Sequence, residues 1–285
     1  MDVIIFTNGG IGDQIQYSSL IAEHGIRGDK VNIFCHPELA FFHESNPNVT
    51  NILSEVDNVK VYDIGYNFAI KTELAAIFSE TPIKKRIGYI DVFGKIAATN
   101  QAAKELMHLA LDKNAQSPKT LAEWFCEIAG VIYSPISFYI NTNNFDCSPD
   151  IVIQYKTNVP DKDWGLDQTK AIVDRFKDKE VWITTHDKNK EELEGIGCKV
   201  LSGSIGEITN TAELISRSKL LVTPDTATFN LGVALGIPTI ILTNGYDRGF
   251  CIPKNNNKVT VIKGETMNDI STDVVIEAIT RRLDV

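Results

Sequence analysis

The sequence predicts an α/β protein with two halves, each built around a parallel sheet. Short runs rich in β-branched residues alternate with amphipathic segments, which is typical of parallel strands joined by crossover helices. A stretch without periodicity at 141–149 separates two such series. Because 285 residues are enough for two cores, we expect domains at 1–148 and 149–285.

Each half contains its own series of expected strands and helices. In the first half the strands are expected at Asp2–Thr7, Val31–Cys35, Val59–Tyr62 and Arg86–Ile90, with helices after Asp13, Pro37, Tyr66, Thr99 and Lys119. In the second half the strands are expected at Ile151–Ile153, Glu180–Thr185, Lys199–Leu201, Lys219–Thr223, Pro238–Thr243 and Lys258–Ile262. Helices are expected there after Gly165, Lys188, Thr209 and Thr226, and over Thr272–Leu283.

Composition excludes several classes of protein. The chain has 28 basic and 37 acidic residues, and neither half is basic, which argues against a nonspecific nucleic-acid binder held by phosphate contacts. The five cysteines form no C-x-x-C pair and lie near no histidine pair, so we expect free thiols and no metal site. The chain begins with no basic n-region and has no apolar run of about 20 residues. We therefore expect a cytoplasmic protein without a transmembrane segment, either free or peripheral to the inner face of the membrane.

The first candidate site is a glycine-containing loop after the first expected strand. Gly9, Gly10 and Gly12 lie there, and they allow a ligand to come close to the start of the next helix, where N–H groups favour negative charge. A third glycine at the spacing of a dinucleotide fingerprint is missing, which argues against a nicotinamide or flavin enzyme. Asp13 is either a helix cap or a carboxylate that accepts a proton from a nucleophilic hydroxyl.

The second candidate site is the loop after the strand at Ile151–Ile153. Thr157, Asn158 and Lys162 offer hydrogen-bond donors and a positive charge suited to a diphosphate. The alternative is an ordinary solvated lysine beside Trp164, a residue that is more often part of a core.

The third candidate site lies in the stretch Ser218–Pro238. A buried strand ends at Asp225, and the small residues Thr226, Ala227 and Thr228 open a helix whose N–H groups suit a phosphate. The alternative is a plain βαβ unit with Asp225 as a cap.

A fourth group of polar residues follows the strand expected at Glu180–Thr185. Thr185 ends this strand, and a carboxylate of Glu191 or Glu192 could hydrogen-bond ribose hydroxyls. The alternative is a solvated helix start enriched in acidic residues.

Taken in order, these motifs resemble glycosyltransferase family 9, the ADP-heptose:lipopolysaccharide heptosyltransferase group. The family pattern has an early G-x-G-D, a central K-x-W, a late D-T-G-x-x-H and a following A-L-G-x-P. The corresponding stretches here are Gly10–Asp13, Lys162–Trp164, Asp225–Asn230 and Ala234–Pro238. The similarity runs through nearly the whole chain in the same order.

The resemblance implies a GT-B fold, with two Rossmann-like domains whose parallel sheets face a central cleft. It implies that the C-terminal domain binds a nucleoside-diphosphate sugar, possibly ADP-linked in the manner of the family, and that the N-terminal domain binds the acceptor. It also implies inverting, metal-independent transfer without a further cofactor, with Asp13 as the general base. Thr157, Lys162 and the turn Asp225–Thr228 would surround the donor diphosphate, and the final helix 272–283 would reach back to the N-terminal domain.

Two positions depart from the family pattern. Ala227 replaces a glycine, and Asn230 replaces a histidine with an amide that can still hydrogen-bond a sugar or phosphate but cannot become cationic. These changes leave open the sugar and the acceptor, which could be a saccharide, a lipopolysaccharide, a modified nucleic acid or a protein. A sugar-nucleotide epimerase and a non-catalytic nucleotide-binding protein on the same scaffold are the competing interpretations. The oligomeric state is not predicted.

Overall fold

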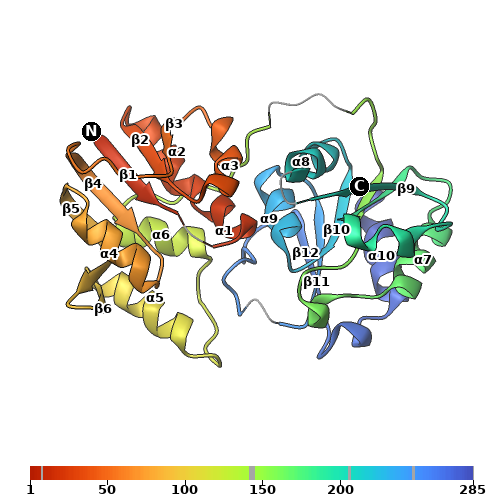
Figure 1. Ribbon diagram of the computed structural model, residues 1–285. Coiled ribbons are helices and arrows are strands. Elements are labelled where there is room, and N and C mark those ends of the chain that lie inside the picture. The colour runs from red at the N-terminus through yellow and green to blue at the C-terminus, as the bar shows by residue number, and fades with distance from the viewer. Residues whose placement is uncertain (8, 141–144, 205–206, 246–247, 285) are drawn as a thin grey trace. The chain divides into compact units, whose positions relative to one another are not determined.

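The computed structural model describes residues 1–7, 9–140, 145–204, 207–245 and 248–284. The chain forms two compact units (Figure 1). The first comprises Met1–Tyr139 and Arg248–Cys251, and the second comprises Ile140–Asp247 and Ile252–Val285. The linker expected at 141–149 lies partly outside the described residues, and the domain boundary at 148 and 149 stays a prediction.

The first unit contains a six-stranded sheet in the order β3-β2-β1-β4-β5-β6. Strands β1 to β5 are parallel, and β6 is antiparallel to β5. The strands are β1 Asp2–Phe6, β2 Lys30–Phe34, β3 Val49–Leu53, β4 Tyr62–Asn67, β5 Ile83–Val92 and β6 Lys95–Ala98. The helices are α1 Ile11–Gln16, α2 Ser18–Ile26, α3 Phe41–Glu44, α4 Thr72–Glu80, α5 Gln101–Leu111 and α6 Leu121–Ala129, with a 3-10 turn at Pro37–Leu39.

Both faces of this first sheet are buried, as the continuous apolar run of β1 requires. Successive strand residues point to opposite faces, so Val3 and Ile5 pack into the core that includes Trp124 of α6, whereas Ile4 and Phe6 pack on the other face. This burial on both faces suits the position of β1 in the middle of the sheet. The glycine loop follows the carboxyl end of β1 and leads into α1.

The second unit contains a six-stranded parallel sheet in the order β12-β11-β10-β7-β8-β9. The strands are β7 Ile151–Gln154, β8 Val181–His186, β9 Lys199–Gly203, β10 Leu220–Pro224, β11 Thr239–Thr243 and β12 Val259–Lys263. The helices are α7 Leu166–Arg175, α8 Ile208–Ser216, α9 Ala227–Ala234 and α10 Thr272–Leu283. Short 3-10 turns lie at Pro160–Lys162, Asp187–Asn189, Glu191–Leu193 and Met267–Asp269.

The two sheets have the same strand order when each is read from its own first strand. In both, the chain runs outward from the first strand to one edge and then returns to pair the fourth strand on its other side. The direction of winding therefore reverses between β1 and β4 and between β7 and β10. Open α/β sheets bind ligands outside the carboxyl ends of the strands at such a switch point.

Most elements predicted from the sequence are present, and two predictions are wrong. Val59–Tyr62 is not a strand, because β4 begins at Tyr62, whereas the helix expected after Tyr66 is present as α4, which begins at Thr72. Only 3-10 turns follow Lys188. The final helix has the expected bounds, and Val275 and Ile279 pack into the core of the second unit. Its predicted contact with the N-terminal domain stays a prediction.

Candidate functional site

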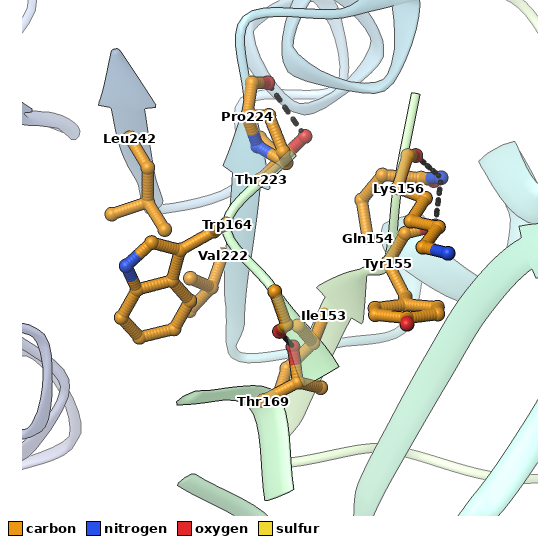
Figure 2. A pocket seen from close by; sticks show the side chains of 11 residues that line it. Ile153, Gln154, Tyr155, Lys156, Trp164, Thr169, Val222, Thr223, Pro224 and Leu242 are labelled. Atoms are coloured by element: carbon orange, nitrogen blue, oxygen red, sulfur yellow. Dashed lines mark hydrogen bonds between the residues drawn. The ribbon is translucent and has the colours of Figure 1, made fainter. Parts of the chain in front are cut away.

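The switch point of the second sheet gathers most of the residues expected to bind a donor. Strands β7 and β10 pair directly, so the loops that leave their carboxyl ends are neighbours. Figure 2 shows a pocket at this place, with Gln154 from the end of β7, Tyr155 and Lys156 from the loop after it, and Thr223 and Pro224 from the end of β10.

Lys162 and Asp225 join these two loops. The Lys162 Nζ atom lies 2.9 Å from Oδ2 of Asp225 and donates to the backbone carbonyl of the same residue at 3.0 Å. Both side chains are largely buried, at 14% and 8% exposure, so the pair is shielded from solvent and salt much more than a surface pair. The sequence prediction that both belong to one site is therefore consistent with their contact.

The start of α9 lies directly after Asp225. Thr226 is the N-cap, and its hydroxyl accepts a hydrogen bond from the Thr228 N–H at 3.2 Å. Ala227 is the first helical residue and its φ is not positive, so a side chain fits where the family pattern has glycine. Asn230 is buried on the same helix. Asp225 and Thr228 contact Lys162 and Gln154, so the N-terminus of this helix lies beside the loop for which the sequence predicts a diphosphate site.

The loop that carries Lys162 is held by its own side chains. The Thr157 hydroxyl donates to the Val159 carbonyl at 2.7 Å, and the Thr157 N–H donates to Asp163 at 2.7 Å. Asn158 is exposed, and its side-chain oxygen accepts a hydrogen bond from Lys188 at 3.4 Å. These hydrogen bonds fix the shape of the loop. Lys162 then forms the charged contact between this loop and the turn after β10.

The acidic residue next to this loop is Glu192 rather than Glu191. Glu192 accepts a hydrogen bond from the Tyr155 hydroxyl at 2.8 Å and forms an ion pair with Lys156. These two contacts hold the pKa of the Glu192 carboxyl below its usual range. Glu191 is exposed in the preceding position of the same 3-10 turn. Thr185 is buried and donates to the Tyr155 carbonyl at 3.1 Å.

The glycine loop and Asp13 lie in the first unit, at the carboxyl end of β1. Asp13 is the third residue of α1, and its Oδ2 accepts the N–H of the N-cap residue Gly10 at 2.9 Å. It is therefore half of a capping box rather than the N-cap itself. Gly9 has a φ of +93°, and a Cβ atom there would lie 2.0 Å from Asp13 Oδ2, so only glycine fits. Gly12 is inside α1, and Asn8 lies outside the described residues.

Two opposing influences act on the Asp13 carboxyl. Burial raises its pKa above the usual 3.8, and this effect exceeds those of the Gly10 N–H and of the Lys71 charge, which both lower it. Lys71 follows β4, the strand beside β1, so it lies across the switch point of the first sheet. A carboxylate with a raised pKa is a stronger base than an ordinary aspartate.

Sequence reasoning missed Gln154, Tyr155 and Lys156, which contact several of the expected residues. Gln154 is the one polar side chain in the run Ile151–Gln154, at the point where the strand ends, and that was the available signal. The structure brings Thr185, Thr228 and Glu192 into contact with this segment.

Within the part of the chain that the structure describes, no group of three His, Cys, Asp or Glu side chains is arranged to hold a metal ion. No helix in the described ranges is long and apolar enough to cross a bilayer.

Comparison with known proteins shows the family of the chain. The family model of glycosyltransferase family 9 (heptosyltransferase) matches residues 58–275, which is more than half of the chain. The chain belongs to glycosyltransferase family 9. It is therefore a glycosyltransferase with heptosyltransferase-like activity. A comparison with curated protein sequences gave no match.

Solved structures of this family have the same fold. Escherichia coli ADP-heptose LPS heptosyltransferase II matches with a TM-score of 0.75 and 15% identity over 99% of this chain and 98% of that one. A family 9 glycosyltransferase from Veillonella parvula matches with a TM-score of 0.79 and 14% identity over 99% and 96%. Escherichia coli heptosyltransferase WaaC with ADP matches with a TM-score of 0.75 and 14% identity over 99% and 100%. The two parallel-sheet units are thus those of a GT-B glycosyltransferase, which confirms the predicted fold class.

Proposed function

We propose that this family 9 glycosyltransferase transfers a heptose-like sugar from an ADP-linked donor to an acceptor hydroxyl with inversion at the anomeric carbon. The observation that carries the donor assignment is the Lys162–Asp225 contact beside the N-terminus of α9. WaaC, a protein of similar structure, was solved both with ADP and with ADP-2-deoxy-2-fluoro heptose, which supports adenosine diphosphate as the carrier.

The proposed reaction is a single displacement. The acceptor oxygen forms a bond to the anomeric carbon while the bond from that carbon to the diphosphate oxygen breaks. The acceptor proton passes to the carboxylate of Asp13, and the bonding electrons leave with ADP. A raised pKa suits Asp13 for this role, because a general base works best when its pKa approaches the working pH.

The leaving diphosphate gains negative charge in the transition state, and the second unit supplies the groups that would stabilise it. Lys162 contributes an ammonium group whose direction is fixed by Asp225. The N-terminus of α9, with Thr226 and Thr228, contributes backbone donors and the positive end of a helix dipole. We propose that these groups suffice without a metal ion.

The nucleoside end of the donor is proposed to lie by Glu192. A carboxylate kept ionised by Lys156 and oriented by the Tyr155 hydroxyl is a strong acceptor for ribose hydroxyls. Thr157 and Asn158 belong to the loop after β7, Thr185 lies near the end of β8, and Asn230 lies on α9; we propose that they complete the donor site. Glu191 is the less favoured ribose ligand because it makes neither of the contacts that fix Glu192.

The test combines binding, stereochemistry and metal dependence. Calorimetry with ADP, UDP and GDP should give the lowest Kd for ADP, and ADP at about 100 times its Kd should raise the free energy of unfolding by about 2.7 kcal/mol. The anomeric configuration of the product, read by NMR, should be opposite to that of the donor, and EDTA should not lower turnover. Failure to bind any nucleoside diphosphate, or retention of configuration, would overturn the proposal.

A further inference from the structure

The Gln154 side chain, at the last position of β7, connects three elements around the proposed donor site. We propose that Gln154 is a positioning residue, whose amide holds the backbone turn at Tyr155 and Lys156 against the first turn of α9. This inference rests on the proposed function, because it concerns the same donor site. Figure 2 shows Gln154 beside Tyr155 and Lys156 at the edge of the pocket.

All the hydrogen-bonding capacity of this amide is used. Its oxygen accepts from the Thr184 hydroxyl at 2.9 Å and from the Thr228 hydroxyl at 3.0 Å. Its nitrogen donates to the carbonyls of Lys156 at 3.1 Å and Tyr155 at 3.3 Å. Since backbone carbonyls can only accept, the orientation of the amide follows from its partners.

The backbone turn that Gln154 contacts is a strained one. Lys156 has a φ of +58°, in the left-handed region that a residue with a side chain seldom adopts. Such a conformation persists only where the surroundings fix it. Gln154 bonds the Lys156 carbonyl, and Glu192 pairs with the Lys156 ammonium, so the residue is held at both its backbone and its side chain.

The Thr228 contact gives this turn a connection to the phosphate-binding end of α9. Thr228 is the second residue of that helix, so Gln154 joins the helix start to the segment that leads into the Lys162 loop. Lys162 and Asp225 join the same two segments at a second point. Two separate links between segments set their spacing, and an error of about 1 Å in the position of a bound group can cost about 10²-fold in rate.

The experiment uses the whole chain and ADP as the probe. Gln154→Met keeps the length of the side chain and removes all of its hydrogen bonds, and we expect the Kd for ADP to rise at least tenfold. Thr184→Val removes one bond from the same amide, and we expect a two- to fivefold rise. Its matched control is Thr239→Val, since Thr239 is equally buried in β11 and its hydroxyl donates to the Ile237 carbonyl at 2.8 Å, at the amino end of the sheet. The control should lose stability without losing affinity for ADP.

A second variant separates positioning from simple loss of packing. Gln154→Glu retains the acceptor for both threonine hydroxyls, but when ionised it offers no donor to the two carbonyls. When protonated it regains one O–H donor. Its affinity for ADP, normalised to the wild-type value at each pH, should therefore recover as the pH falls, and a purely structural role predicts no such recovery.

The outcomes distinguish this inference from the function on which it rests. If the wild type binds ADP and Gln154→Met binds it with an unchanged Kd, the positioning role is wrong while the donor assignment stands. If the wild type binds no ADP, the donor assignment itself is wrong. If Gln154→Met does not fold, the comparison of Thr184→Val with Thr239→Val decides, and equal Kd values for those two variants overturn the positioning role.

Discussion

The Lys162 ammonium contacts Asp225 at both its carboxylate and its backbone carbonyl, at 2.9 Å and 3.0 Å. The two residues lie 63 positions apart and come from the loops after β7 and β10. One cation thus fixes the carboxylate and the backbone of the turn that opens α9. Because the Asp225 side chain is only 8% exposed, any variant that removes the ammonium leaves a buried carboxylate without this partner.

Lys162→Met is therefore expected to lower both affinity and stability. Loss of a charge-assisted contact to the diphosphate should weaken ADP binding by about 1.5–3 kcal/mol, or roughly 10- to 150-fold in Kd. Loss of one partner of a buried pair should also lower the melting temperature. Calorimetry and thermal melting of the same preparation measure both effects.

The matched control for this variant is Lys199→Met. Lys199 also forms an ion pair at 2.9 Å, with Glu180, but it lies at the amino end of the second sheet and is 60% exposed. It should change neither ADP affinity nor stability by much, since exposed pairs contribute little. An unchanged Kd in Lys162→Met would show that Lys162 does not contact the donor.

The pair Glu191 and Glu192 offers a test within one turn. Glu192→Gln should weaken ADP binding and reduce the preference for ADP over 2′-deoxy-ADP, because the ionised acceptor proposed for the ribose is lost. Glu191→Gln makes the same change of charge one position earlier and should leave both quantities unaffected. Competition binding with the two nucleotides gives the preference directly. A reversed result would assign the ribose to Glu191.

Gly9→Ala should displace the Asp13 side chain without changing residue 13 itself. The φ of +93° strains any residue other than glycine, and the added Cβ atom would meet Asp13 Oδ2 at 2.0 Å, so the carboxylate must move. We expect kcat to fall at least tenfold while ADP affinity in the second unit is retained. Gly10→Ala is the control, because a Cβ atom there meets no atom within 4 Å. Equal kcat values in the two variants would show that the close packing of Gly9 against Asp13 is not needed for catalysis.

The sequence predicted the second sheet better than the first, for a physical reason. The central strands of the second unit, β7, β10 and β11, are short apolar runs buried on both faces, which have a clear signal. In the first unit, Val59 and Val61 resemble a strand but are exposed, at 87% and 53%. The true strand β4 contains Asp63 and Asn67, polar residues that are uncommon in a strand and interrupt its apolar pattern. Asn67 is tolerated in the core because its amide donates to the Tyr89 carbonyl and accepts the Ala69 N–H.

The candidate site was predictable where the motifs lie in one loop, and not where contacts cross between strands. Lys162, Asp225 and Asp13 stand in short stretches with a chemical pattern. The Lys156–Glu192 pair spans 36 positions and depends on the register of β7 against β8 and on a left-handed backbone at Lys156. Neither feature can be recognised in a single sequence. Strand register is not visible there, and lysine is not a residue that indicates a positive φ.

Asp13→Asn separates the capping role of this residue from its proposed chemistry. An asparagine oxygen can still accept the Gly10 N–H, so we expect the free energy of unfolding to change by about 1 kcal/mol or less. The amide cannot accept the acceptor proton, so kcat should fall by about 10²–10⁴. Asp63→Asn is the control, because Asp63 also accepts a backbone N–H at 2.9 Å in the same unit. A variant with lost stability but full kcat would assign Asp13 a structural role only.

The raised pKa of Asp13 predicts two pH dependences of opposite sign. Activity requires the ionised carboxylate, so kcat/KM should fall on the acid side at a pH above the usual 3.8 of aspartate. Stability follows the other direction: as the pH rises above 3.8, the unfolded chain releases this proton before the folded protein does, so the free energy of unfolding decreases until the folded-state pKa is passed. Other carboxylates also titrate here, so the difference between wild type and Asp13→Asn isolates the effect. That difference, measured by urea unfolding between pH 3 and pH 8, should decline with pH, and a rise would show that Asp13 is stabilised in its ionised form and is a weak base.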